Sequence, residues 1–247
     1  MNIVVAMKQI PDLQQIRIRN RQPVLNDIPL TFGNIDKNAL EAGVQLKETI
    51  GGKVIVIAAG SDALEDTIKE ALAAGADEAC LIINDQLENI ESATSAEILA
   101  GAIKNMEDVG IIIFGEGSGD NYSGQAGSRV AGILGLPQVA YAKSIHVSEN
   151  RATIVRSLED CDEVLETELP VIVSVLADIN EARIPSVTQI LKAGKKPKEI
   201  LNLEIPVAGL LETLSNLAPE MKRKQIEIKN VDELIKALEA EGFRGRN

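Results

Sequence analysis

Histidine, cysteine and large aromatic side chains are scarce in this 247-residue chain. It has no tryptophan, two tyrosines and three phenylalanines, so its core must be aliphatic. The single histidine, His146, falls in an alternating strand pattern, which excludes a Ser-His-Asp triad and a histidine-ligated metal site. The two cysteines, Cys80 and Cys161, share no motif and indicate neither a disulfide framework nor a metal knuckle. We therefore expect no catalytic residue and no bound metal in this chain.

Long hydrophobic runs and an excess of positive charge are also missing. No apolar run approaches the ~20 residues that span a bilayer, and the opening apolar run at residues 1–6 is too short for a signal peptide. The 25 basic residues against 37 acidic ones give a net charge of −12. This charge argues against general nucleic-acid binding, which neutralises phosphates with Lys and Arg. We expect a soluble cytoplasmic protein that binds no nucleic acid and does not insert directly into a membrane.

The first half of the chain alternates between short apolar runs and amphipathic helical patterns. With 45% hydrophobic and 25% charged residues, the composition is that of an ordinary globular protein. Alternation of this kind, with short connections, predicts a doubly wound, mostly parallel Rossmann-like sheet with helices on both faces. The expected strands are residues 3–7, 54–59, 79–83 and 109–114, and the expected helices are about 36–50, 63–74, 92–103 and 124–134. Asp36 is the expected cap of the first of these helices. Residues 16–19 and 24–25 flank a turn at 20–23 and are expected to form a small hairpin.

The pattern changes after Pro137. Runs at 139–147, 152–157 and 164–169 alternate as antiparallel strands do, and 171–176 is another buried strand. We expect residues 178–200 to be irregular apart from a short helix at about 187–192. The predicted division is an α/β nucleotide-binding domain at 1–200 and a C-terminal arm at 201–247, which ends in an amphipathic helix at 231–241.

A glycine-rich segment between the strand at 109–114 and the following helix carries the clearest chemical signal. At the carboxyl end of such a sheet, backbone N–H groups can form a nest for a phosphate, and the next helix offers its N-terminus. The segment is neither a Walker loop nor a GxGxxG fingerprint, and a long structural loop is the alternative. The candidate nucleotide-binding residues are Phe114, Gly115, Glu116, Gly117, Ser118, Gly119, Asp120, Asn121, Tyr122, Ser123, Gly124 and Gln125.

Two further charge clusters stand out. An acidic run at 159–168 alternates across a predicted hairpin, which favours a solvated surface over a metal site. In contrast, a stretch free of acids carries the five cations Arg183, Lys192, Lys195, Lys196 and Lys198. Such a patch can steer an acidic partner, with a solvated basic loop as the alternative.

Several segments together resemble the beta subunit of electron transfer flavoprotein, over nearly the whole chain. No single segment is decisive, but their order and spacing are specific. They are VVAMKQIPD at 4–12, NID at 34–36, ALEA at 39–42, ALAAGAD at 71–77, residues 120–125, GLPQ at 135–138, LPVIV at 169–173, INEAR at 179–183 and the lysine-rich 192–197.

The resemblance implies a heterodimer with a larger alpha subunit, which holds most of the contacts to the FAD. The C-terminal arm at 201–247 and its helix are the expected contact for this subunit, with packing of the helix on the same chain as the alternative. It implies a buried AMP in the beta subunit, at the positions of Ala6, Asn34 and Ala59 and in the loop 114–125. It also implies a docking segment at about 180–192 for acyl-CoA or related dehydrogenases, with Val187 as the apolar anchor.

The sequence departs from the family pattern at several of these places. Ala182 replaces a usual proline in the docking segment, and Cys161 stands where glycine or an acid is usual. The lead-in at 116–119 lacks the bulkier, more basic residues of the family, and Leu13 occupies a position that in many members lies near the flavin.

Three functions remain open from the sequence. The first is an electron carrier subunit with a structural AMP and no catalysis of its own. The second is a bifurcating member in which a second FAD replaces the AMP and oxidises NADH. The third is a stand-alone adenine-nucleotide-binding regulator, which would be a stable monomer without flavin.

Overall fold

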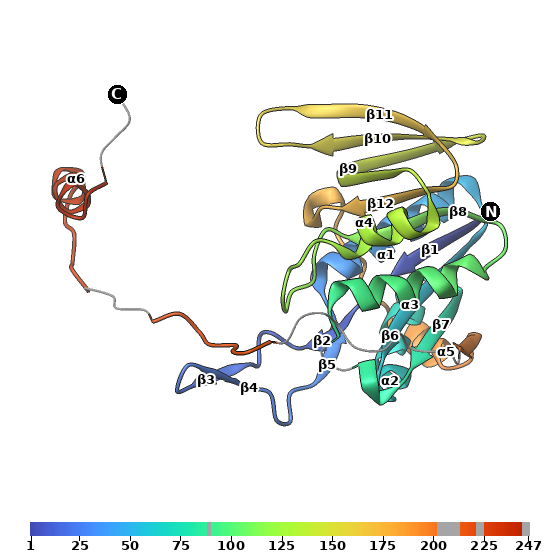
Figure 1. Ribbon diagram of the computed structural model, residues 1–247, viewed down its shortest axis with the longest axis horizontal. Helices are drawn as coiled ribbons and strands as arrows, with labels where there is room; N and C mark the ends of the chain where they lie inside the picture. Colours follow the sequence, from blue (N-terminus) through green and yellow to red (C-terminus); the bar gives the residue numbers. More distant parts are fainter. Residues whose placement is uncertain (88–89, 202–212, 221–224, 244–247) are drawn as a thin grey trace.

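A nine-stranded sheet forms the centre of the computed structural model, which describes residues 1–87, 90–201, 213–220 and 225–243. Neighbouring strands are parallel from β9 to β13, and β9, β10 and β11 form an antiparallel extension. The expected mostly parallel sheet is confirmed (Figure 1). Across the sheet the strands are β11 (Asp162–Glu168), β10 (Arg151–Ser157), β9 (Gln138–Ser148), β12 (Val171–Val175), β8 (Val109–Gly115), β1 (Asn2–Ala6), β6 (Lys53–Gly60), β7 (Glu78–Ile83) and β13 (Lys198–Leu201).

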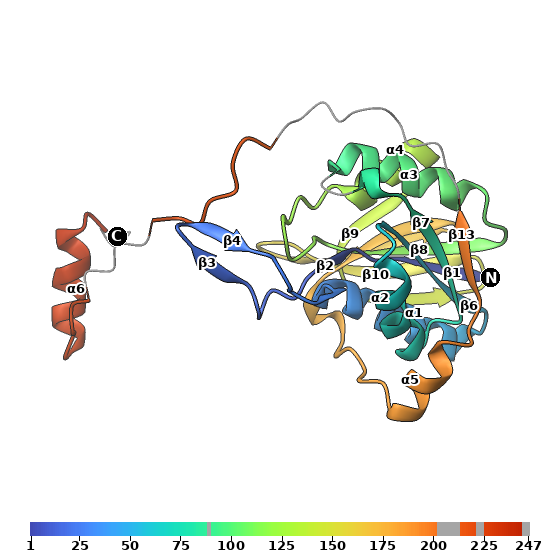
Figure 2. The same cartoon turned by 90° about the horizontal axis from the view of Figure 1, so that it is seen from below.

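Four long helices cover the two faces of this sheet, as the alternation predicts. Helices α1 and α2 lie on one face and α3 and α4 on the other (Figure 2). The helices are α1 (Asn34–Ile50), α2 (Leu64–Ala73), α3 (Ser92–Lys104), α4 (Ala126–Leu134), α5 (Val187–Ala193) and α6 (Val231–Ala240), with short 3-10 turns η1 (Asp85–Leu87) and η2 (Ala177–Ile179).

Alternate residues of each central strand supply the two cores. In β1, Ile3 and Val5 point toward α1 and α2, whereas Val4 points toward α3 and α4. All three side chains are fully buried. This double burial explains why the strands read as continuous apolar runs rather than as alternating ones.

The chain reverses direction across the sheet between β1 and β8. From β1 the chain continues to β6 on one side, and β8 pairs with the other side of β1. Ligands of doubly wound proteins bind beyond the carboxyl ends of the strands at such a switch point. The glycine-rich segment follows β8 and therefore lies at this place.

Two expectations differ from the structure. Residues 198–201 form a strand, β13, beside β7, although the region was expected to be irregular, because its main-chain groups pair in register with 79–82. Asp36 was expected to cap α1, but the helix begins at Asn34 with Gly33 as its N-cap. The Asp36 side chain is turned inward instead and accepts a hydrogen bond from the Lys8 N–H at 2.9 Å.

A hairpin and the chain end project from this body. The expected hairpin is present as β3 (Arg17–Arg19) and β4 (Gln22–Val24), next to a two-stranded pair formed by β2 (Gln9–Pro11) and β5 (Leu30–Phe32). At the hairpin tip, the Arg21 carbonyl accepts a hydrogen bond from the Ala218 N–H at 2.7 Å, and the Arg21 Nε donates one to the Ala218 carbonyl at 2.8 Å. Beyond this contact α6 lies well away from the sheet (Figures 1 and 2).

Candidate functional site

The residues predicted for a nucleotide site gather at the carboxyl edge of the central strands. Ala6 ends β1, Ala59 is the last residue but one of β6, and Phe114 precedes the end of β8. Strand pairing brings them together, because β1 pairs with β6 on one side and with β8 on the other. Asn34 is exposed at the start of α1, two residues after the end of β5.

The loop from 115 to 125 is fixed to its neighbours by hydrogen bonds. The Glu116 N–H donates to the Val175 carbonyl at 3.0 Å, which ties the loop to the end of β12. At the far end, the Gln125 side-chain oxygen accepts hydrogen bonds from Arg129 and from Ser92, which ties it to α4 and α3. The loop therefore starts and ends at defined points, and its exposed part is residues 119–125.

Turns inside the loop involve the polar residues that the sequence analysis selected. The Tyr122 N–H donates to the Ser118 carbonyl at 3.0 Å, and the Ser118 hydroxyl donates to the Asn121 side-chain oxygen at 2.9 Å. The Asp120 carboxylate pairs with the Lys8 ammonium at 2.6 Å. Burial alone would raise the pKa of Asp120, but the hydrogen bonds from Lys8 and Ser118 hold that pKa below its ordinary value.

Other groups approach the backbone closely at two glycines of the loop. A Cβ added at Gly115 would lie 2.9 Å from an Ile35 methyl group and 3.0 Å from an Asp36 carboxylate oxygen. A Cβ added at Gly119 would lie 2.8 Å from a methyl group of Leu13. The 2.9 and 2.8 Å distances are shorter than those of real Cβ atoms, so the two glycines let the loop lie directly against the start of α1 and the segment after β2.

The carboxyl of Asp36, which was expected from the sequence to cap a helix, is buried. Its side chain lies behind the loop, and the residue is only 7% exposed. Burial raises the pKa of Asp36 to about 7, with a further contribution from nearby Asp120, although the hydrogen bond and the charge of Lys8 act in the opposite direction. No local pattern around Asp36 reveals this burial, because it depends on the loop after β8.

The charges around the loop favour binding through the main chain. Acidic side chains on or beside it are Asp36, Glu116 and Asp120, and the ammonium of Lys8 is already paired with the last of these. A phosphate there would be held mainly by backbone N–H groups and by the N-terminus of α4.

The predicted docking residues divide into two groups. The Arg183 guanidinium is bound to Glu41 at 2.6 Å and to Glu48 at 2.8 Å, and these hydrogen bonds raise its pKa. The Lys196 ammonium donates to the carbonyls of Leu72 and Ala76 at the end of α2, at 2.8 and 2.5 Å. Both cations therefore hold the segment against α1 and α2 rather than pointing toward solvent.

The other predicted docking residues are exposed. Val187 is 73% exposed at the start of α5, and Lys192 and Lys195 are exposed at and beyond its end. Sequence reasoning did not single out Ile184 and Leu191, which are 94% and 74% exposed and lie in the same segment. Together these residues form an apolar ridge with two cations beside it.

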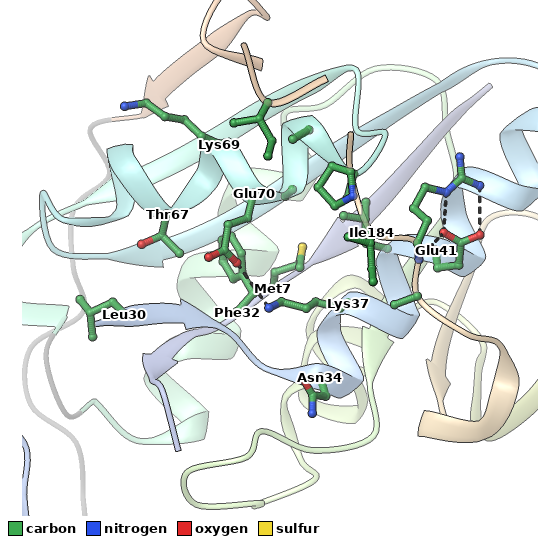
Figure 3. Close-up of a pocket in the computed structure, with 18 of the residues that line it drawn as sticks. Met7, Leu30, Phe32, Asn34, Lys37, Glu41, Thr67, Lys69, Glu70 and Ile184 are labelled. Atoms are coloured by element: carbon green, nitrogen blue, oxygen red, sulfur yellow. Dashed lines mark hydrogen bonds and ion pairs between the residues drawn. The ribbon is translucent and has the colours of Figure 1, made fainter. Parts of the chain in front are cut away.

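A cavity of about 670 Å³ lies beneath this segment, between α1 and α2 (Figure 3). Met7, Phe32 and Leu40 provide apolar walls. Lys37 and Glu70, which also line the cavity, form an ion pair at 3.5 Å. The cavity lies on the α1–α2 face of the sheet, whereas the glycine-rich loop leads into α4 on the other face.

The part of the chain that the structure describes has few side chains that could bind a metal or act as a nucleophile. Within it, no cluster of three or more His, Cys, Asp or Glu side chains is arranged to hold a metal ion. Burial raises the pKa of the Cys80 thiol to about 11, and Cys161 is exposed. His146 is exposed on β9. Among the described residues, no helix is both long and apolar enough to cross a membrane.

The sheet, its switch point and the loop at the end of β8 define a doubly wound α/β protein. A profile of the electron transfer flavoprotein domain matches residues 26–206. The chain is 33% identical to the electron transfer flavoprotein subunit beta of Thermoanaerobacterium thermosaccharolyticum over 207 residues, which is 83% of this chain and 79% of the relative. The chain belongs to the electron transfer flavoprotein family.

Two further relatives cover similar shares of the chain. The electron transfer flavoprotein subunit beta of Megasphaera elsdenii is 33% identical over 213 residues, 83% of this chain and 78% of the relative. The caffeyl-CoA reductase-Etf complex subunit CarD of Acetobacterium woodii is 32% identical over 207 residues, 83% of this chain and 79% of the relative.

Proposed function

We propose that this chain is the beta subunit of a heterodimeric electron transfer flavoprotein, which carries electrons between dehydrogenases and a downstream acceptor. The family match over residues 26–206 and the beta-subunit relatives carry this proposal. The scarcity of reactive side chains is consistent with a subunit that supports electron transfer without catalysis of its own. The FAD that accepts the electrons is held mainly by the alpha subunit.

The nucleotide of this subunit binds at the carboxyl edge of β1, β6 and β8. Ala6, Ala59 and Asn34 lie around this edge, and the loop 114–125 closes it. AMP is the proposed ligand. A nucleotide with one phosphate suits a loop whose own side chains are acidic and whose nearest ammonium is already paired with Asp120.

An FAD in place of the AMP is the second candidate, and it would make the chain part of a bifurcating enzyme that oxidises NADH. The Acetobacterium woodii relative supports this second candidate, because its name places that protein in a complex of a reductase with an electron transfer flavoprotein. The two candidates differ in the nucleotides that the heterodimer contains.

The exposed ridge of α5 is the proposed contact for the dehydrogenase. Val187 is its anchor, with Ile184 and Leu191 beside it, and Lys192 and Lys195 steer an acidic partner. Arg183 and Lys196 support the ridge from below through their contacts with α1 and α2.

The C-terminal arm is the proposed contact for the alpha subunit. The stripe of α6 made by Val231, Leu234, Ile235 and Leu238 is 42–69% exposed. A helix that leaves its apolar stripe exposed is suited to burial against a partner. The hairpin contact at Arg21 and Ala218 directs the arm away from the sheet toward that partner.

Electron transfer to the reconstituted heterodimer tests the proposal. We expect an acyl-CoA dehydrogenase with its substrate to bleach the flavin absorbance of the heterodimer. Val187→Asp should slow this transfer at least about tenfold, because it places a charge in an apolar contact, whereas Thr188→Asp, one residue along the same exposed helix, is the matched control. A chain that forms no heterodimer, or whose heterodimer accepts no electrons, would contradict the proposal.

A further inference from the structure

The only two tyrosines of the chain, Tyr122 and Tyr141, are both unusually exposed for their size. Their exposed fractions are 55% and 47%. Of the three phenylalanines, Phe32 and Phe114 are buried, and Phe243 lies beyond α6 near the chain end. The aromatic surface of the α/β body is therefore this pair of tyrosines.

Strand pairing places both tyrosines at the carboxyl edge that carries the proposed nucleotide site. Tyr122 belongs to the loop after β8. Tyr141 lies in β9 beside Ala142, whose carbonyl accepts the Leu176 N–H at 3.0 Å just after the end of β12. The last residue of β12 pairs with Gly115 on one side and with Ala142 on the other, so Tyr141 and the start of the loop that carries Tyr122 flank the carboxyl end of β12. They are close enough for Tyr141 to contribute to the raised pKa of Tyr122.

Both tyrosines have left-handed backbone conformations, which bulky residues rarely adopt. The φ angle is 48° at Tyr122 and 61° at Tyr141. Tyr141 also lies at a register shift between β9 and β12, and such bulges redirect side chains. Conformational cost of this kind is typical of functional sites, where the side chain is placed for a ligand rather than for stability.

The ring of Tyr122 is fixed by its neighbours. A Cβ added at Gly117 would lie 2.9 Å from Cδ2 and 3.0 Å from Cε2 of this ring, so the ring lies directly against the glycine backbone. Interaction of the hydroxyl with the Glu116 carboxylate raises the pKa of the tyrosine. Tyr122 therefore presents an aromatic ring to solvent in a fixed orientation, with more than half of the residue exposed.

We propose that Tyr122, with Tyr141 beside it, is a stacking platform for the planar heteroaromatic ring of the nucleotide bound by the loop 114–125. The inference rests on the proposed nucleotide site and adds the residues that hold the ring. Base–aromatic stacking supplies affinity at a site where the nearest ammonium, that of Lys8, is already paired. The ring is the adenine of AMP or the isoalloxazine of FAD, and both have the flat π-face that stacking needs.

Substitutions at Tyr122 separate stacking from structural support. The full chain is titrated with AMP and, separately, with FAD, and bound nucleotide is measured by equilibrium dialysis. Tyr122→Phe keeps the ring and should bind within about tenfold of the unmodified chain, since it loses one hydrogen bond. Tyr122→Asn removes the ring and should bind roughly 5- to 150-fold more weakly. Because asparagine tolerates a positive φ, the same variant should unfold at a higher temperature.

Spectroscopy gives a second readout and identifies the ring. The chain has no tryptophan and two tyrosines, so Tyr141→Phe leaves Tyr122 as the only source of tyrosine emission. In that variant, bound AMP should quench the tyrosine emission, with N-acetyltyrosinamide as the control for absorption by the ligand. Bound FAD should lose flavin emission by stacking on Tyr122 and regain it in Tyr122→Asn. The titration, with AMP or with FAD, that shows tight binding together with these signals identifies the stacked ring as adenine or isoalloxazine.

The possible failures are distinguishable. Tight binding of a nucleotide that Tyr122→Asn leaves unchanged would overturn the platform and leave the proposed nucleotide site in place. A fall in both affinity and unfolding temperature would show that Tyr122 supports the fold, which also overturns the platform. If the unmodified chain binds neither AMP nor FAD, the platform and the nucleotide site are both wrong.

Discussion

Replacing Asp36 by asparagine should stabilise the protein, and increasingly so as the pH rises. The carboxyl of Asp36 is buried behind the glycine-rich loop and accepts the Lys8 N–H at 2.9 Å. Asparagine has nearly the same shape, and its side-chain oxygen can accept the same hydrogen bond. It carries no charge, so it avoids the cost of holding a carboxylate in this place.

The sign and size of this stability change follow from the raised pKa of Asp36. The pKa of Asp36 is about 7 in the folded chain against an ordinary 3.8, so between these values the folded chain holds a proton that the unfolded chain has released. The contribution of this group to stability is complete below about pH 4 and is lost as the pH rises through 7. At 1.36 kcal/mol per pKa unit, the loss is about 4 kcal/mol at most. Asp36→Asn should therefore gain up to that amount above pH 7 relative to its difference at pH 4.

Urea unfolding at a series of pH values between 4 and 8 measures this difference. Asp66→Asn is the matched control, since Asp66 is exposed on α2 and its pKa is lowered by the hydrogen bond from Lys69. The control should show no gain that grows with pH. A difference between Asp36→Asn and the unmodified chain that stays constant from pH 4 to pH 8 would refute the reasoning.

Three further sets of substitutions test other parts of the structure. Gly119→Val should reduce the nucleotide content of the purified protein, and Leu13→Ala should restore part of it by removing the 2.8 Å clash; equal content in all variants would contradict this. Lys195→Glu should slow electron transfer at low ionic strength and little at high ionic strength. Lys196→Met should lower the unfolding temperature, because the Lys196 ammonium binds the carbonyls of Leu72 and Ala76, at and just beyond the end of α2. A salt-independent rate for the first, or an unchanged unfolding temperature for the second, would argue against these assignments. Arg183→Ala should cost about 1–3 kcal/mol of the free energy of unfolding in urea, since it leaves a buried glutamate without its partner, and a loss below about 0.5 kcal/mol would count against that role.

The order of strands and helices could be predicted because burial dictates it locally. Central strands such as β1 and β8 are buried on both sides, so they read as unbroken apolar runs, and the glycines that end helices mark the boundaries. The hairpin at β3 and β4 was also readable from its turn, where Asn20 and Arg21 have positive φ angles. The position of the loop after β8 followed from the same alternation.

Other features depend on contacts between distant parts of the chain. Strand β13 has four residues, three of them exposed, and it forms because it pairs with β7 more than a hundred residues earlier. The direction of Lys196 is set by the end of α2, which no local pattern around residue 196 reveals. The inward turn of Asp36 depends in the same way on Lys8 and on the loop after β8.

The nucleotides of the purified heterodimer test the central proposal most directly. The chain is copurified with its alpha subunit, the complex is denatured, and the released AMP and FAD are counted per heterodimer. An electron carrier with a structural nucleotide in this subunit predicts one FAD and one AMP. Two FAD and no AMP would contradict it, since this chain would then hold a flavin of its own.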